Sequence, residues 1–224
     1  MEELTNVPQF ALQLFGMNLV FNTQTIIMTW IVMAALILFG FFATRKINIL
    51  PNPFQVVAEL FSTAFMGLVV DALGEERAKK YFPLVGTLFM FLLLCNWLGV
   101  IPNLSEPTKD LNTPFSLGLL GFVLAHYAGI KTKGLKAYLR GYMEPIFFMA
   151  PLNVISELSK VVSISFRLYG NIMGGSIIIL VVSYLVYGLI IPPVAIAFFG
   201  MFVGTIQAFV FTMLTLVYIS VQVN

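Results

Sequence analysis

One arginine, Arg167, lies within a strongly apolar stretch of the chain. A charged residue costs about 2.5 to 3.5 kcal/mol at the middle of a membrane helix. Twelve Leu, Ile and Val residues between Ile172 and Ile191 each return about 0.3 to 0.6 kcal/mol, so the helix can still insert. Because an arginine that faces lipid at depth is unfavourable, we expect Arg167 to face a protein partner or an aqueous cavity rather than to extend to a helix end.

Polar and small residues recur around Arg167 at helical spacing. Intervals of three or four residues place one stripe on a single helix face: Lys160, Ser163, Arg167, Asn171 and Gly174. A second stripe follows later in the chain: Gly200, Gly204, Gln207, Ala208, Phe211, Thr215 and Tyr218. Two such stripes on paired helices predict one buried polar surface. The glycines Gly170, Gly174 and Gly175 predict close approach of another helix, with Asn171 and Gly204 both facing that partner.

Several of these residues have simpler interpretations. Glu157 and Lys160 are three residues apart, so they could form an ordinary ion pair at a helix end. Gln207 could be a simple hydrogen-bond donor between helices, and the glycines could serve packing alone. The single cysteine, Cys95, excludes an intrachain disulfide. The sequence predicts no metal site, cofactor, nucleotide loop or catalytic triad.

The amino-acid composition indicates that these residues lie in a lipid environment. Hydrophobic residues make up 59% of the 224 residues and charged residues 10%, against about 25% charged in soluble domains. The apolar residues form blocks that approach the roughly 20 residues needed to cross a bilayer. A net charge of +2 in short basic clusters gives no reason to expect nucleic acid binding.

The apolar blocks predict an all-α integral membrane protein, as a single membrane domain over residues 1–224. Five transmembrane helices are expected, at about 25–43, 81–101, 115–130, 151–189 and 193–221, and a polar loop is expected over residues 103–114 between the second and third of them. The stretch at about 51–70 has an apolar side broken by polar residues, which predicts an interfacial amphipathic helix. The last two spans are too long to stand upright in a bilayer, so we expect a long tilted hairpin.

Basic residues predict the orientation of the chain in the membrane. Nine of the twelve Lys and Arg residues fall in the two connections that alternating topology places on one side: Arg45, Lys46, Arg77, Lys79, Lys80, Lys131, Lys133, Lys136 and Arg140. The positive-inside rule makes that side cytoplasmic. With five spans, the N-terminus is then outside and the C-terminus cytoplasmic.

Three motifs connect the chain with a known family. The run Ser163-Ile164-Ser165-Phe166-Arg167-Leu168-Tyr169-Gly170-Asn171 resembles the S-x-x-x-R-L-[FY]-G-N signature of subunit a of F-type ATP synthases. The segment from Asn96 to Pro102 is similar to the family's N-x-x-G-x-x-P at the end of a span, and Gln207-Ala208-Phe209 is similar to its last helix. With the order of spans, the resemblance covers nearly the whole chain.

The resemblance implies a non-catalytic stator subunit that couples ion flow to ATP synthesis in a bacterial plasma membrane. Its implied partners are the rotor ring of c proteolipids, the peripheral stalk subunit b, the rest of the complex and membrane lipid. Arg167 would face the ring carboxylates, with Gln207 beside it and Asn171 along the ion path. Glu157, Lys160, Ser163 and Tyr218 would have supporting roles.

The sequence departs from the family at two supporting positions. In the family that this sequence resembles, many proton-driven members have an acid at the position of Ser176 and a histidine or an acid at the position of Gly200. The missing titratable groups favour sodium over protons as the coupling ion, because a hydrated cation needs only oxygen ligands. Against this, water also carries protons, and the ion choice depends chiefly on the rotor's binding site.

Two other classes of function fit the same residues less well. A secondary transporter often shows inverted repeats and broken helices around a central site, but the two halves of the chain show no self-similarity. An intramembrane enzyme would need paired Asp, His or Ser residues at membrane depth, and the apolar blocks offer none.

Overall fold

The computed structural model describes residues 9–14, 17–45, 52–101, 104–143, 149–185 and 191–223, which are almost entirely helical. The long helices are α1 (Thr23–Thr44), α2 (Pro53–Leu73), α3 (Glu75–Trp97), α4 (Asn112–Lys133), α6 (Met149–Leu185) and α8 (Gly204–Val223). Within these described ranges, six helical segments are long and apolar enough to cross a membrane. The chain is therefore an all-α integral membrane protein, as predicted, with a small strand pair at its start.

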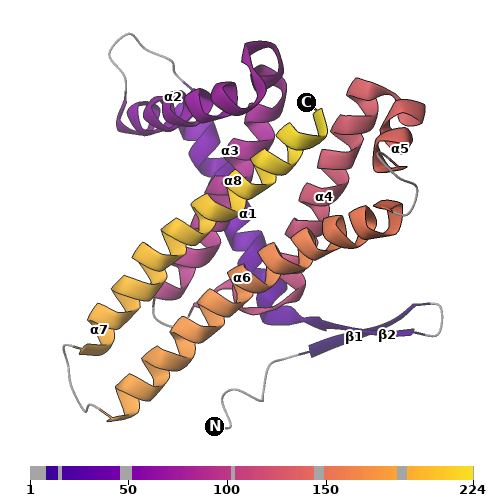
Figure 1. The fold of residues 1–224 in the computed structure, drawn as a ribbon. Helices are drawn as coiled ribbons and strands as arrows, with labels where there is room; N and C mark the ends of the chain where they lie inside the picture. Colours follow the sequence, from indigo (N-terminus) through magenta and orange to yellow (C-terminus); the bar gives the residue numbers. More distant parts are fainter. Residues whose placement is uncertain are drawn as a thin grey trace.

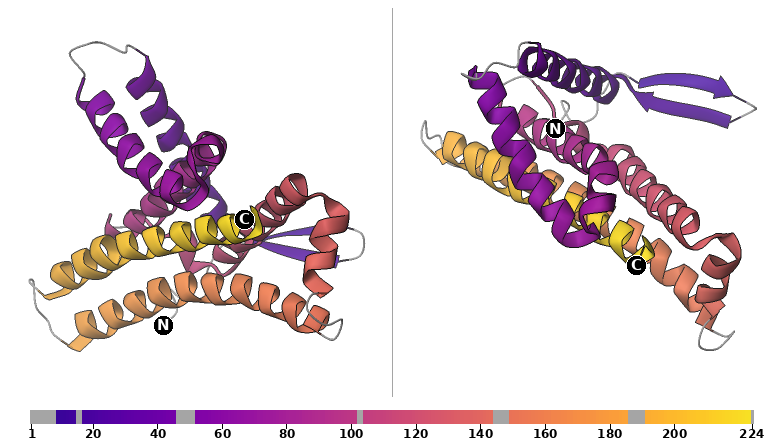
Figure 2. Two further views of the ribbon diagram at one scale, coloured as in Figure 1. Left: turned by 45° about the horizontal axis from the view of Figure 1, so that its top comes forward. Right: turned by 90° about the horizontal axis from the view of Figure 1, so that it is seen from above.

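The helix α2 differs from the other long helices in its orientation. It begins at Pro53, where a missing N–H costs nothing, and ends at Gly74, whose φ of 78° suits glycine. Its length and apolarity would let it cross a membrane. In Figures 1 and 2, however, α2 lies across α8 rather than alongside it. This arrangement supports the interpretation of α2 as an interfacial helix.

Five shorter helical segments are also present among the described residues: α5 (Leu135–Met143), α7 (Ile191–Ile196), the π-helix η4 (Ala197–Val203) and the 3₁₀ helices η2 (Leu98–Val100) and η3 (Pro107–Lys109). The last expected span, 193–221, is thus one continuous run from α7 through η4 to α8. The helix α6 has 37 residues and is about 56 Å long at 1.5 Å per residue. Residues 186–189 of the expected fourth span lie outside the described residues. The helix α6 runs diagonally beside the α7–α8 run in Figure 1, as expected for a tilted pair.

Two boundaries and one strand pair were not expected. The helix α3 begins at Glu75 rather than near Tyr81, with both acidic residues of its first turn at the positive helix end. The helix α4 extends three residues beyond 115–130 at each end. The antiparallel strands β1 (Gln9–Leu14) and β2 (Met17–Asn22) precede α1, and Asn22 caps α1 by accepting from the amide of Gln24 at 3.1 Å.

The helix α8 forms the centre of the structure. It packs against α3 and α4, with α6 along one flank and α1 and α2 on the opposite side (Figure 2). Its buried apolar side chains include Phe211, Leu216 and Ile219. Glycines of α4 allow close approach: a Cβ on Gly121 would lie 3.0 Å from Thr215, and one on Gly129 3.0 Å from the Gln222 carbonyl. Small residues thus hold α4 and α8 together, as in other membrane helix pairs.

The helix ends that carry basic residues lie at the same end of the molecule. The C-terminal end of α1, the α2–α3 junction, the α4–α5 junction and the end of α8 all lie at the top of Figure 1. We call this the basic end. The starts of α1 and α4 and the end of α3 lie at the other end, which we call the opposite end. The fold therefore separates the basic connections from the polar connection between α3 and α4, of which residues 104–111 are described.

Replacement of Gly129 by alanine should destabilise the chain. The added methyl group would meet a backbone carbonyl at 3.0 Å and the Tyr138 ring at 2.7 Å, and the carbonyl cannot rotate away. We expect a loss of about 1 to 3 kcal/mol, typical of overpacking. The measurement is the fraction of monodisperse complex that remains in detergent after heating. Gly40→Ala in α1, where nothing lies within 4 Å, is the matched control, and equal melting of the two variants would contradict the packing argument.

Candidate functional site

Arg167 lies in the middle of α6 on a face that the rest of the chain leaves open. Its neighbours at one-turn spacing, Ser163, Gly170 and Asn171, are also exposed, while Ile164 and Leu168 on the other face are buried. Within the part of the chain that the structure describes, Arg167 has no hydrogen bond or ion pair. A guanidinium presents five donors and stays charged under cellular conditions. The site therefore contains an unpaired cation in the middle of a helix that is long and apolar enough to cross a membrane.

Asn171 connects this face to α8. Its Nδ2 donates to Oε1 of Gln207 at 2.7 Å, one helical turn beyond Arg167. Gln207 is 3% exposed, and its Nε2 is buried without a partner among the described residues. A buried donor without an acceptor costs about 1 to 3 kcal/mol. The Asn171–Gln207 pair is thus a polar site with one unused donor beside the arginine.

A second polar cluster lies two helical turns from Arg167, toward the basic end. Lys160 Nζ is 2.6 Å from Glu157 Oε1, which confirms the i, i+3 ion pair that the spacing allowed. The same ammonium lies 5.6 Å from the centre of the Tyr218 ring on α8. Lys160 is therefore already paired in the chain, and Arg167 is the cation of α6 that is left for another partner.

A cavity of about 340 Å³ lies beside this cluster, at the basic end. Its lining includes the polar or charged residues Lys133, Asn153, Ser156, Glu157, Lys160 and Gln222. The cavity is open to the surface between α5, α6 and the end of α8. It offers water a route toward Lys160 from the basic end.

The structure separates the expected glycine stripes. A Cβ on Gly170 or Gly174 would meet nothing within 4 Å, so these two form an open face together with Arg167. Gly175 lies against Phe199 of η4 instead. On the second stripe, Gly204 is buried with its Cβ position 3.0 Å from that of Asn96. The expectation that Gly204 faces a partner is therefore wrong, because α3 already occupies that side of α8.

The N-x-x-G-x-x-P motif at the end of α3 begins with a buried asparagine, Asn96, that connects three segments of the chain. Asn96 is fully buried, and its Nδ2 donates to the carbonyl of Gly204 at 2.9 Å. Its Oδ1 accepts from the hydroxyl of Thr108 at 3.0 Å. The motif signalled the end of a span, but the sequence offered no sign that Thr108 would fold back to it. One side chain thus joins α3, α8 and the connection that contains the 3₁₀ turn η3 (Pro107–Lys109).

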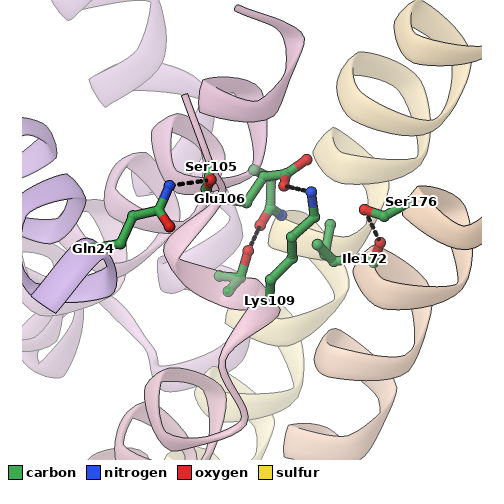
Figure 3. A network of polar contacts seen from close by, with 8 residues as sticks. Gln24, Ser105, Glu106, Lys109, Ile172 and Ser176 are labelled. Atoms are coloured by element: carbon green, nitrogen blue, oxygen red, sulfur yellow. Dashed lines mark hydrogen bonds and ion pairs between the residues drawn. The ribbon is translucent and has the colours of Figure 1, made fainter. Parts of the chain in front are cut away.

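The two departures from the family pattern, Ser176 and Gly200, lie toward the opposite end. The Ser176 hydroxyl donates to the Ile172 carbonyl at 2.9 Å, and Gly200 lies against Val100 at the end of α3. Figure 3 shows the charged pair Glu106 and Lys109 close to Ile172 in the same region. Sequence reasoning placed this pair in a surface loop, and a buried carboxylate here was missed. Among the described residues, no group of three His, Cys, Asp or Glu side chains could hold a metal ion.

Comparison with known proteins decides the family. The family model described as "ATP synthase A chain" matches residues 26–220. The chain belongs to the ATP synthase A chain family.

Three relatives show how far the similarity extends. The chain is 41% identical to ATP synthase subunit a of Moorella thermoacetica, over 88% of this chain and 89% of that protein. It is 38% identical to ATP synthase subunit a 2 of a Bradyrhizobium species, over 97% and 96%. It is also 38% identical to the chloroplastic subunit a of Stigeoclonium helveticum, over 90% and 85%. The matched range of this ATP synthase A chain includes every candidate residue named above.

The open face of this A chain can be tested by cysteine labelling. In a variant without Cys95, a cysteine at Gly170 should react with a membrane-permeant maleimide about tenfold faster than one at Gly175, because exposure governs thiol access. Both positions lie on α6, and only Gly175 is covered, by Phe199. The rates would be measured by mass spectrometry on the chain in detergent. Equal rates would show that the α6 face around Arg167 is not open.

Proposed function

We propose that this chain is the ion-conducting stator subunit of an F-type ATP synthase, and that Arg167 is the group that faces the rotor. The observation that carries the proposal is the unpaired guanidinium on an open, small-residue face of a membrane helix. A charge in this place requires a partner. A ring of proteolipids that each carry one carboxylate meets the requirement, because every subunit presents the same acid in turn.

The shape of the open face supports a helical partner. Gly170 and Gly174 leave room beside Arg167 for the backbone of another helix. In lipid, such close packing replaces the hydrophobic drive that soluble helices have. Asn171, which is exposed on this face, adds hydrogen-bonding capacity at the same level. The rotor helix would therefore dock along the line from Ser163 to Gly174.

Electrostatics explains what the arginine does to a passing acid. At about 4 Å and an effective dielectric near 20, the pair gains roughly 4 kcal/mol, which lowers the pKa of the carboxyl by about 3 units. Burial in lipid raises the pKa of a carboxyl by up to about 3 to 5 units. An acid next to Arg167 thus releases its ion, and on leaving for lipid it must bind one. With separate access from the two sides, this alternation gives rotation a direction.

Two polar regions on either side of Arg167 fit the two access routes. The inner half-channel is assigned to the cavity beside Glu157 and Lys160 at the basic end. The outer half-channel is assigned to the polar region around Asn96, Thr108 and Ser176 at the opposite end (Figure 3). The positive-inside rule makes the basic end cytoplasmic. The C-terminus is then cytoplasmic and the N-terminus outside, in a bacterial plasma membrane.

The remaining parts of the complex are assigned to other chains. Subunit b of the peripheral stalk would hold this subunit against rotation, and a nucleotide-binding head would carry out ATP chemistry. This subunit itself would be non-catalytic. Isolation of the chain in mild detergent as a conducting monomer, without an acidic ring-forming proteolipid, would favour a self-contained channel or transporter instead.

Arg167→Ala should abolish ATP-driven ion pumping and ATP synthesis while the complex stays assembled. The loss follows because neutral alanine cannot drive the ion off the rotor acid. The measurement combines proteoliposome transport with the subunit composition on native gels. Leu180→Ala is the matched control on the same helix, and it should retain most of the activity because Leu180 is an exposed apolar residue outside both polar regions. Half or more of the coupled synthesis in an assembled Arg167→Ala complex would contradict the proposed role.

The coupling ion can be decided by sodium uptake during ATP hydrolysis with a protonophore present. The argument for sodium depended on an outer route without acids, and the buried carboxylate of Glu106 weakens that argument. We therefore propose protons as the coupling ion. The expected result is that transport collapses with the protonophore and that ATP hydrolysis does not respond to sodium. Sodium uptake that persists would identify a sodium motor.

A further inference from the structure

The side chain of Glu106 folds inward from the connection between α3 and α4. It is 10% exposed, although the sequence places it in a polar loop. Its Oε1 lies so close to Gly99 that a Cβ there would be only 1.7 Å away. The carboxylate therefore occupies the space that a side chain at position 99 would otherwise fill. The glycine of the motif at the end of α3 makes room for this acid.

Charged and polar groups surround the carboxylate. Lys109 Nζ lies 2.6 Å from its Oε2, and the lysine side chain is 36% exposed. The neighbouring residue Thr108 is fixed to Asn96, and Asn96 is fixed to Gly204 of α8. These bonds hold the η3 turn against the bundle, so Glu106 is part of the membrane domain and not of a free loop.

The pair lies next to Ser176 and Gly200, the two positions where this chain lacks the titratable groups of the family pattern. Gly200 packs on Val100, which directly follows Gly99. The η3 turn contacts α6, and Figure 3 shows the Lys109 side chain between Glu106 and Ile172, whose carbonyl accepts from Ser176. A carboxylate from the α3–α4 connection thus enters the region where α6 and η4 provide none.

We propose that Glu106 is the carboxylate that takes up the transported cation on the outer route, and that Lys109 is its built-in counterion. The inference rests on the proposed function, because it assumes that ions pass this region toward Arg167. An acid buried without a partner would hold its ion too firmly or stay neutral. The partly exposed ammonium on a flexible stem pairs with the carboxylate between arrivals and can move aside toward the opposite end when a cation binds.

The alternative is that Glu106 and Lys109 only fasten the connection to the bundle. The two roles differ in what they require. A fastening role needs the bond between positions 106 and 109, whereas an ion-handling role needs a carboxylate in this region, even when another residue supplies it. Ser176 lies on the facing side of the region in Figure 3, so a longer acid there can approach the same space.

The experiment measures ATP-driven transport by the whole complex in proteoliposomes. Glu106→Gln should lower transport about tenfold or more, in the range of other lost acid–base groups, with assembly and detergent-solubilised ATP hydrolysis unchanged. Glu106→Asp should retain part of the transport. Glu106→Gln combined with Ser176→Glu should restore transport at least threefold over Glu106→Gln alone. Glu76→Gln, at an exposed acid of the α2–α3 junction, is the control and should leave transport unchanged.

Two results would overturn the assignment: full transport by Glu106→Gln, or a transport loss that Ser176→Glu does not relieve. If Glu106→Gln prevents assembly by leaving Lys109 unpaired, the neutral pair Glu106→Gln with Lys109→Gln replaces it in every comparison. Parallel assays with a protonophore and sodium, and without sodium, identify whether the handled cation is a sodium ion or a proton. Failure of the proposed stator function is separately visible, as undiminished transport by Arg167→Ala.

Discussion

A fixed positive charge in a medium that solvates charge poorly is the constraint on which this structure depends. The chain provides no acceptor for Arg167 among its described residues, although it pairs the other cation of α6, Lys160, with a neighbouring acid. The fold leaves the whole line of small residues around the arginine uncovered. An unpaired arginine on an uncovered face destabilises the single chain, yet the site needs both features. A partner removes this cost because it covers the face and supplies the missing negative charge.

The rest of the fold holds α6 in a defined position without covering that line. Glycines in α4 bring α8 close, and the buried hydroxyl of Ser165 shares its single proton between the carbonyls of Val161, at 2.8 Å, and Pro114, at 3.2 Å. Between α6 and α8, the polar contacts are few and placed at separate levels: Asn171 with Gln207, and Lys160 with Tyr218. The back of α6 is thus anchored firmly, and its front stays available.

The sequence was sufficient for features that depend on local spacing. Apolar length predicted the long helices, and the isolation of Arg167 within apolar residues predicted a charge in need of a partner. Spacing of three residues allowed the Glu157–Lys160 pair. The sequence was insufficient where segments that are distant in the chain meet in space. Gly204 shares a helix face with Gln207 by periodicity, but Asn96 of α3 covers it. Glu106 reads as a loop residue, and only the bonds of Thr108 to Asn96 show that this connection folds inward.

The π-helical turn at Ala197–Val203 also has a consequence for how this helix can change over evolutionary time. Wide turns of this kind hold one residue more than an α-helix of the same rise. Loss of a single residue from this segment would return it to regular α-helix with the parts on either side in nearly the same orientation, because the wide turn already absorbs the extra residue. The same loss from the regular helix α8 would instead rotate everything before it by about 100°. A length change of one residue should therefore be tolerated in this stretch far better than in the α-helices beside it.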